Sequence, residues 1–341
     1  MKIPVYSSTI RRKEMDAVLS CMVAEKIGPG EINQKLVQLI RETLAVDSAA
    51  VFRSASIALN YALTALDLQK GSGIIISALA PSWHHQAVVQ LGYTPVIADV
   101  DPETTLVTAT SVGEAVKNGG RLLLLHESLG FLPDMDALLS LNIPVIEDIS
   151  QSVGATLGER QAGQFGVFSI LGLEERDLLT AGGGAVLLAP NRRESIVLRK
   201  LADEAPLTDI LPDINSALAL VQLKEMARNT VLRQELQSLY IRSLLQGRHK
   251  TIIQGGDGSA MPYSFPVILS SGFKDVKQYV SRKEIEIELA FEGSVADKLG
   301  EALEGCISAK SVLIRCVLFP LYPRLGTGNA AKIAKVLATL P

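Results

Sequence analysis

The sequence predicts an α/β protein whose central sheet is mainly parallel and covered by helices. Short apolar runs recur through the first two thirds of the chain without alternating apolar and polar residues, which is typical of strands buried on both faces. Helical patterns fill the gaps between the runs, for example from Ile57 to Leu68 and from Met135 to Leu141. The runs lie at 73–78, 94–100, 121–125, 143–147, 166–171 and 184–188.

The pattern changes after Asn215. Residues 216–245 carry apolar side chains at helical spacing over about eight turns, which is long for a globular helix and predicts a connector between domains. A glycine-rich break follows at 255–258, and shorter strand and helix signals return beyond it. We therefore expect a large domain over 1–235 and a smaller C-terminal α/β domain over 236–341.

Composition narrows the class of protein. The chain has 341 residues, is 48% hydrophobic and carries a formal net charge of -3, so it offers no basic field for nucleic acid and no cluster for a lipid surface. The N-terminus lacks the apolar segment of a signal peptide, and no apolar run reaches the roughly 20 residues that span a bilayer. The three cysteines are far apart and predict neither disulfides nor a metal site. A soluble protein in the reducing cytoplasm is expected.

Asp148 and Gln151 follow the predicted strand at 143–147. Ligands of an open parallel sheet sit beyond the carboxyl ends of its strands. A buried carboxylate at Asp148 can hold a protonated ring nitrogen, because the opposite charge keeps both groups ionised. Gln151 lies three residues on, on the same helical face. The alternative is that Asp148 only caps the following helix.

Ser54, Ala55 and Ser56 precede a predicted helix. Small hydroxyl residues at a helix N-terminus favour a phosphate, through backbone N–H groups and the helix dipole. They are also ordinary N-cap residues. Ser169, in the strand at 166–171, is a candidate for an additional hydroxyl on the same phosphate.

Three ring-bearing residues, Trp83, His84 and His85, follow the run at 73–78. A flat ring here can stack on a flat cofactor, whereas Trp83 or His84 can equally be packed core. Metal binding is not favoured, because adjacent histidines on a helix point in different directions and no Cys, Asp or Glu completes a ligand set.

The order and spacing of these motifs resemble the DegT/DnrJ/EryC1/StrS family, the sugar aminotransferases of the type I pyridoxal-phosphate fold. The resemblance covers nearly the whole chain. It implies an aspartate-aminotransferase-like large domain, a pyridoxal or pyridoxamine phosphate cofactor, a nucleotide-linked keto-sugar substrate and a homodimer with shared sites. The family's stacking aromatic then falls on His85, its phosphate motif on 54–59 and its Glu-Asp-x-x-Gln motif on 147–151. Similar segments lie at 92–104, 130–138, 154–166, 168–169 and 213–223.

The chain departs from this family at the Schiff-base lysine. Counting five residues on from Ser169 gives Glu174, and counting eight back from Gly184 gives Arg176. No lysine lies between Lys117 and Lys200. Transamination needs a primary amine that forms an imine, which neither side chain can supply. A lysine from elsewhere in the chain, such as Lys200 or Lys224, is not favoured as the source of this amine, because a catalytic side chain must be placed to within about an ångström.

Other family features are altered as well. The family's histidine before its Gly-x-Pro-x-Asp loop aligns with Glu127, with His126 one place earlier, and Ala55 replaces the glycine of the phosphate motif. The stretch 203–213 lacks the segment that helps to complete the neighbouring subunit's site in the family.

Three functions remain open. The first is a pseudoenzyme or partner subunit, paired with itself or with an active paralogue. The second is an enzyme that holds its cofactor non-covalently, as a dehydratase branch of the family does with histidine in place of lysine. The third is a cofactor-free module that binds a nucleotide sugar, which the cost of an unpaired Asp148 disfavours.

Overall fold

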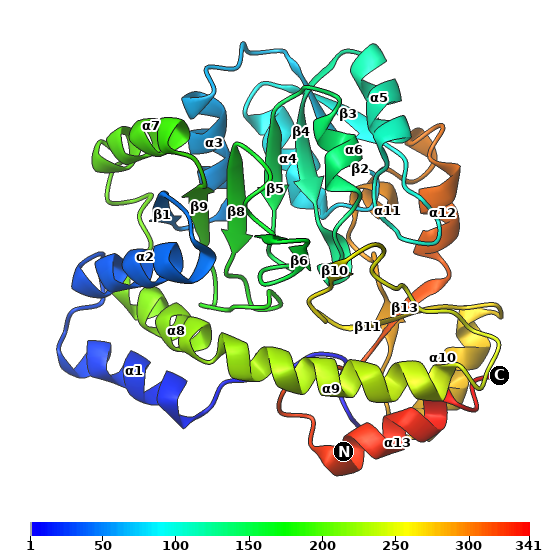
Figure 1. Ribbon diagram of the computed structural model, residues 1–341. Helices are drawn as coiled ribbons and strands as arrows, with labels where there is room; N and C mark the ends of the chain where they lie inside the picture. The colour runs from blue at the N-terminus through cyan, green and yellow to red at the C-terminus, as the bar shows by residue number, and fades with distance from the viewer. Residues whose placement is uncertain (1) are drawn as a thin grey trace.

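The computed structural model describes residues 2–341 and is built around one seven-stranded sheet (Figure 1). All six predicted runs form strands of this sheet, and the strand β1 is added at one edge. Its order is β1-β9-β8-β5-β4-β2-β3; β9 is antiparallel to both β1 and β8, and the remaining pairs are parallel. The predicted mainly parallel sheet is therefore confirmed. The strands are β1 Ser48–Phe52, β2 Gly73–Ser77, β3 Thr94–Ala98, β4 Gly120–His126, β5 Val145–Asp148, β8 Phe168–Gly172 and β9 Ala185–Ala189.

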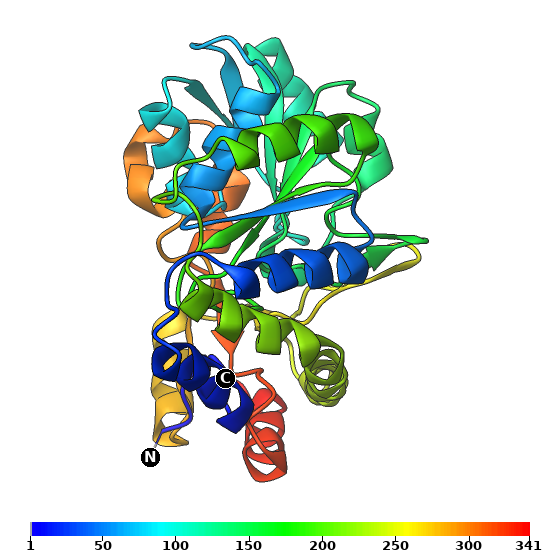
Figure 2. The same cartoon turned by 90° about the vertical axis from the view of Figure 1, so that its left-hand side faces the viewer.

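Helices cover both faces of the sheet, and each face has its own core. The first face packs against α3 Ala55–Ala65, α4 Ser82–Gln90 and α7 Arg192–Asp203. The second packs against α2 Glu31–Leu44, α5 Ala109–Lys117, α6 Met135–Leu139 and α8 Asp213–Lys224. Figure 2 shows α7 and α2 on opposite sides of β1. Because side chains alternate along a strand, Ile146 and Asp148 face the first layer and Val145 and Glu147 the second.

The predicted long helix is two consecutive helices. The first, α8, ends at Lys224, and α9 Met226–Leu244 begins after Glu225 and leads to the C-terminal part of the chain (Figure 1). There, β11 Phe265–Ile268, β13 Cys316–Phe319 and β12 Glu288–Leu289 form an antiparallel sheet in the order β11-β13-β12. The helices α10 Phe273–Arg282 and α13 Thr327–Leu337 share its core.

Residues from each side of the expected boundary at 235/236 pack into the core of the other side. Near the N-terminus, Ile3 pairs with Ile285 and lies in the core of the smaller sheet. Later in the chain, the amide of Val295 donates to the carbonyl of Ala80, and Val295 lies in the core of the large sheet. Two helices beyond the boundary, α11 Val295–Leu299 and α12 Ile307–Leu313, also contribute residues to the core of the large sheet.

The remaining elements are short or peripheral. The helix α1 Arg12–Val23 packs on α8, and no helix within 2–341 is long and apolar enough to cross a membrane. Two short 3₁₀ segments, Ser128–Gly130 and Gly300–Ala302, lie in loops. A small sheet in the order β10-β6-β7 joins Thr156–Leu157 to Arg160–Gln161 and Gly258–Ser259.

Candidate functional site

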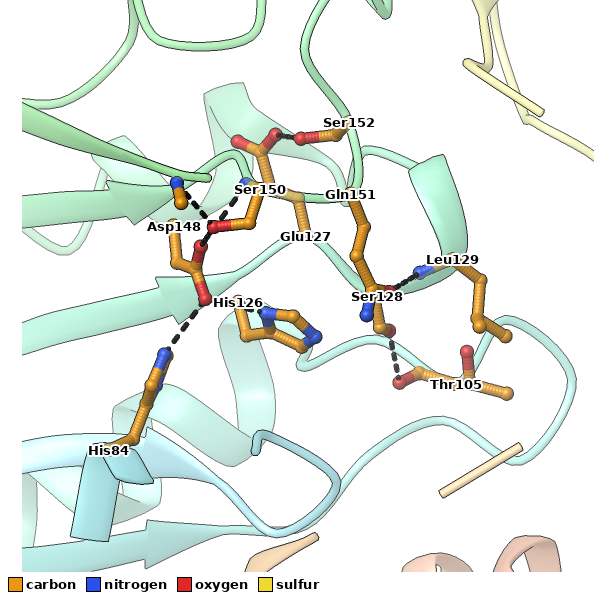
Figure 3. A network of polar contacts seen from close by, with 11 residues as sticks. His84, Thr105, His126, Glu127, Ser128, Leu129, Asp148, Ser150, Gln151 and Ser152 are labelled. Carbon is orange, nitrogen blue, oxygen red and sulfur yellow. Dashed lines mark hydrogen bonds and ion pairs between the residues drawn. The ribbon is translucent and has the colours of Figure 1, made fainter. Parts of the chain in front are cut away.

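Two histidines meet one carboxylate at the carboxyl edge of the large sheet (Figure 3). Asp148 ends β5, His126 ends the neighbouring β4, and His84 lies in the first turn of α4 after β2. Oδ2 of Asp148 lies 2.9 Å from Nε2 of His84 and 2.9 Å from Nδ1 of His126. All three side chains are buried. The sheet order β5-β4-β2 explains why residues this far apart in sequence come together.

The second carboxylate oxygen of Asp148 is held by Ser150. Oδ1 accepts from the amide of Ser150 at 3.1 Å and from its hydroxyl at 2.5 Å, and that hydroxyl also accepts from the amide of Gly172. The residues after Asp148 form a turn at 150–154 and not a helix, so the alternative that Asp148 caps a following helix is not met. A carboxylate has about four acceptor positions, and those of Asp148 are all taken by groups of this chain.

The electrostatics follow from this geometry. Burial raises the pKa of Asp148, but the hydrogen bonds from His126 and His84 outweigh burial and hold that pKa well below its usual range. Burial lowers the pKa of His84, with a partial compensation from Asp148. Since an ionised carboxylate only accepts, both imidazole nitrogens that face Asp148 carry a proton. Their lone pairs are therefore not available to a metal in this arrangement, although the three atoms lie within 4.8 Å of one another.

Two further buried carboxyls, Glu127 and Glu147, lie near Asp148, and the sequence did not predict that they form a pair. Oε1 of Glu147 accepts from the amides of Phe165 and Gly166, at 2.8 and 2.5 Å, and Oε2 accepts from the amide of Gly163 at 2.9 Å. Glu127 receives a hydrogen bond from the hydroxyl of Ser152. Burial, followed by the charge of the neighbouring Glu147, raises the pKa of Glu127 well above its ordinary value. Of the two carboxyls, Glu127 is therefore the one whose protonated form the fold favours.

Gln151 supports a turn beside the site. Its Oε1 accepts from the amide of Leu129 at 2.7 Å. Leu129 and Gly130 both have positive φ, and a Cβ added at Gly130 would collide with the carbonyl oxygen of Met261. Gln151 thus positions the 3₁₀ segment Ser128–Gly130 (Figure 3).

The predicted phosphate residues are separated by the structure. Ser54 is the N-cap of α3 and accepts from the amide of Ile57 at 3.2 Å, and Ala55 and Ser56 begin the helix half-buried. Ser169 is fully buried and donates to the carbonyl of Gly163 at 3.0 Å. In the sheet it is paired with Glu147, which places its side chain on the second face, opposite α3. The structure does not bring Ser169 to the start of α3.

The structure brings His84 to Asp148, whereas no hydrogen bond joins His85 to Asp148. His85 is half-buried and His84 has no exposed surface. The ring of Trp83 packs edge-on against that of His84, with ring centroids 4.2 Å apart. Adjacent positions on a helix point about 100° apart, so the docking of α4 decides which imidazole enters the site.

The loop between β8 and β9 holds the two positions aligned with the family's lysine. Glu174 and Arg176 are exposed, and Arg176 pairs with Glu288. The residue that points inward is Asp177, whose carboxylate accepts from the amide of Glu174 and packs with Ser150 over Gly172. Burial raises the pKa of Asp177 to about 7. Neither alignment count pointed to Asp177, and no signal in the sequence distinguishes it from its neighbours.

A cleft of about 680 Å³ lies near Leu132 and Pro133. Four carboxylates line it, from Asp101, Asp134, Asp136 and Asp257. This charge disfavours a diphosphate within this cleft.

The residues fit a pyridine-type cofactor only in part. The start of α3 offers amides and hydroxyls to a phosphate. The ring-nitrogen end does not fit, because no acceptor of Asp148 is left for a pyridinium N–H. In this arrangement Asp148 is a structural anion that joins α4, β4 and β5.

The sequence and the fold both resemble those of known proteins. Residues 8–338 match the DegT/DnrJ/EryC1/StrS aminotransferase family. The fold is similar to a putative sugar aminotransferase from Streptococcus pneumoniae in its PLP form, at 15% identity and TM-score 0.90, over 99% of this chain and 98% of the other. It is also similar to the E. coli GDP-4-keto-6-deoxy-D-mannose-3-dehydratase with bound hydrated PLP, at 18% identity and TM-score 0.88, over 99% and 100%. A third similar structure is a GDP-4-keto-6-deoxymannose-3-dehydratase mutant with bound GDP-perosamine, at 18% identity and TM-score 0.87, over 98% and 99%.

Proposed function

Because the chain belongs to the DegT/DnrJ/EryC1/StrS aminotransferase family, we propose that it is a member of this family that does not transaminate. It keeps the fold and acts as a pseudoenzyme or as the partner subunit of an active paralogue. The sugar-nucleotide chemistry of similar structures, one of which holds GDP-perosamine, supports a nucleotide sugar as its ligand.

One observation carries this proposal, namely that no lysine lies anywhere between Lys117 and Lys200. The interval includes β4, β5, β8 and the β8–β9 loop, which together make up most of the carboxyl edge around Asp148. The loop offers carboxylates at Glu174 and Asp177 and a guanidinium at Arg176, none of which can form an imine. Lys200 and Lys224, the nearest lysines beyond β5 in the sequence, are exposed on α7 and at the end of α8.

An exposed apolar stripe supports assembly with a second subunit. Met15, Leu19, Met22 and Val23 recur at helical spacing on α1 and are exposed, while the opposite side of α1 packs on α8. We propose a homodimer or a heterodimer with an active paralogue, in the cytoplasm. The three cysteines are free and buried, which fits a reducing compartment.

The test is a search for an imine. The purified protein is mixed with pyridoxal phosphate, its visible absorbance is recorded, and it is then reduced with borohydride and its intact mass measured. We expect no adduct at a single lysine and no conversion of an amino donor. An active relative with its lysine serves as the positive control. A stoichiometric adduct on one lysine, together with amino transfer, would contradict the proposal.

A second candidate is an enzyme that uses pyridoxal or pyridoxamine phosphate without a covalent bond. The start of α3 favours it, because Ser54, Ala55 and Ser56 still present a helix N-terminus to a phosphate. The dehydratase with bound hydrated PLP supports this possibility as well. Tight uptake without a reducible adduct is the result that would favour this candidate over the first.

A further inference from the structure

We propose that the Nε2–H group of His84 takes the place at Asp148 that the ring N–H of the cofactor would occupy. This chain therefore does not bind pyridoxal or pyridoxamine phosphate. The N–H at Nε2 of His84 occupies the acceptor of Asp148 that a pyridinium N–H would need. This inference concerns the ring site and does not depend on the missing lysine. It deepens the proposed function, because it would leave the pocket without amine and without cofactor.

The first step is the count of donors around Asp148. Ser150 fills Oδ1 with its amide and its hydroxyl, and the two imidazoles fill Oδ2. A fifth donor would have to displace one of these four. The Ser150 donors are fixed by the turn and by the hydroxyl's bond with Gly172, and His126 is paired in register with Asp148. His84 is thus the donor with which a cofactor ring would compete.

The second step is the packing of the His84 ring. It has no exposed surface, and two further rings contact it edge-on. The centroid of Trp83 lies 4.2 Å away and that of His126 5.7 Å away, with interplanar angles of 75° and 86°. An aromatic ring with an N–H aimed at Asp148 is therefore already present, and it comes from α4. Because His84 is anchored in a helix of the large domain, it cannot leave without breaking these contacts.

The third step is the protonation of the group. Burial lowers the pKa of His84, so the imidazole is neutral at physiological pH and has a single proton. That proton faces Asp148, and Nδ1 has no hydrogen-bond partner among residues 2–341. A neutral N–H donor can satisfy Asp148 at every pH at which the carboxylate is ionised, so the site stays intact without a ligand.

The experiment measures non-covalent binding of pyridoxamine phosphate, which cannot form an imine with lysine. Wild type, His84→Val and the matched control His85→Val are titrated by calorimetry, with folding checked by circular dichroism. We expect no saturable binding to wild type or H85V, and saturable binding to H84V that is at least about tenfold tighter than the upper limit on affinity set by wild type. Adding Asp148→Asn to H84V should abolish that binding.

The wild-type protein alone can overturn the inference, even if H84V does not fold. Saturable binding of pyridoxamine phosphate to wild type, lost in D148N, would show that the ring site is open. Where H84V does fold, stoichiometric zinc in wild type that is lost in H84V would also overturn it, since the imidazole would then be a metal ligand. Either result leaves the proposed loss of transamination intact, which only a covalent lysine adduct with turnover would contradict.

A spectroscopic measurement adds a readout that does not depend on binding. In ¹⁵N-labelled protein, His84 should show the tautomer protonated at Nε2 and should not titrate near neutral pH. A His84 resonance that titrates as an exposed imidazole does would contradict the buried contact with Asp148.

Discussion

Nδ1 of His126 lies 2.9 Å from Oδ2 of Asp148, and the two residues are register partners on adjacent parallel strands. The pair lies at the carboxyl edge of the sheet, where His84 of α4 contacts the same oxygen of Asp148. Asp148 is therefore expected to contribute to stability whether or not a ligand binds.

Replacing Asp148 by Asn should reduce the free energy of unfolding by about 3 kcal/mol, because an amide nitrogen would face donors that now point at a carboxylate. Urea denaturation measures the loss. The exposed Asp136→Asn serves as the control and should change stability by less than about 0.5 kcal/mol. Equal, small effects of both substitutions would show that the histidines do not depend on the carboxylate.

Glu127 and Glu147 are both fully buried but should respond in opposite ways to the change to glutamine. Glu147 accepts from three backbone amides, so Glu147→Gln should cost about 3 kcal/mol. Glu127→Gln should cost less than about 1 kcal/mol at neutral pH, because the raised pKa of Glu127 already keeps it protonated. Denaturation of both variants decides the assignment, and a reversed order would place the proton on Glu147.

Glu127 also predicts a pH dependence. A carboxyl whose pKa is raised on folding binds a proton that the unfolded chain releases near about pH 4.3, so its contribution to stability falls as pH rises from there through the folded pKa. Glu127→Gln removes this contribution. The difference in stability between E127Q and wild type should therefore shift in favour of E127Q with rising pH.

Asp177 should show the same sign in a defined window. Burial raises its pKa to about 7, so the contribution of Asp177 to the stability of wild type is expected to fall between about pH 4 and pH 7 and to stay level above it. Asp177→Asn should gain at least about 2 °C in melting temperature relative to wild type between pH 5 and pH 8. Glu204→Gln, at an exposed position on another element, is the control. A constant difference across this range would show that Asp177 is ionised throughout.

Gly130 should not tolerate a side chain. Its φ is +87°, and a Cβ there would collide with the carbonyl of Met261. Gly130→Ala is expected to cost more than about 3 kcal/mol, whereas Gly328→Ala, where the added Cβ meets nothing within 4 Å, should cost little. Thermal denaturation compares the two, and a stable G130A would mean that this turn can rearrange.

Much of the fold and part of the site could be predicted from the sequence. The apolar runs marked six strands, because strands buried on both faces need uninterrupted apolar residues. The sequence also places Asp148 at the site, because it is the residue directly after the predicted strand at 143–147. The continuous helix predicted over 216–245 is interrupted at Glu225, which apolar periodicity does not reveal because the residues on both sides keep helical spacing.

The sequence by itself determined that no lysine lies over 118–199, whatever the conformation of the chain. It also determined the family, through motifs whose order survives divergence. Only the tertiary structure decided which imidazole contacts Asp148, which face Ser169 takes and which buried carboxyls lie close together. These depend on how α4 docks and on the register of β4, β5 and β8, and such packing between distant segments has no signature in local sequence.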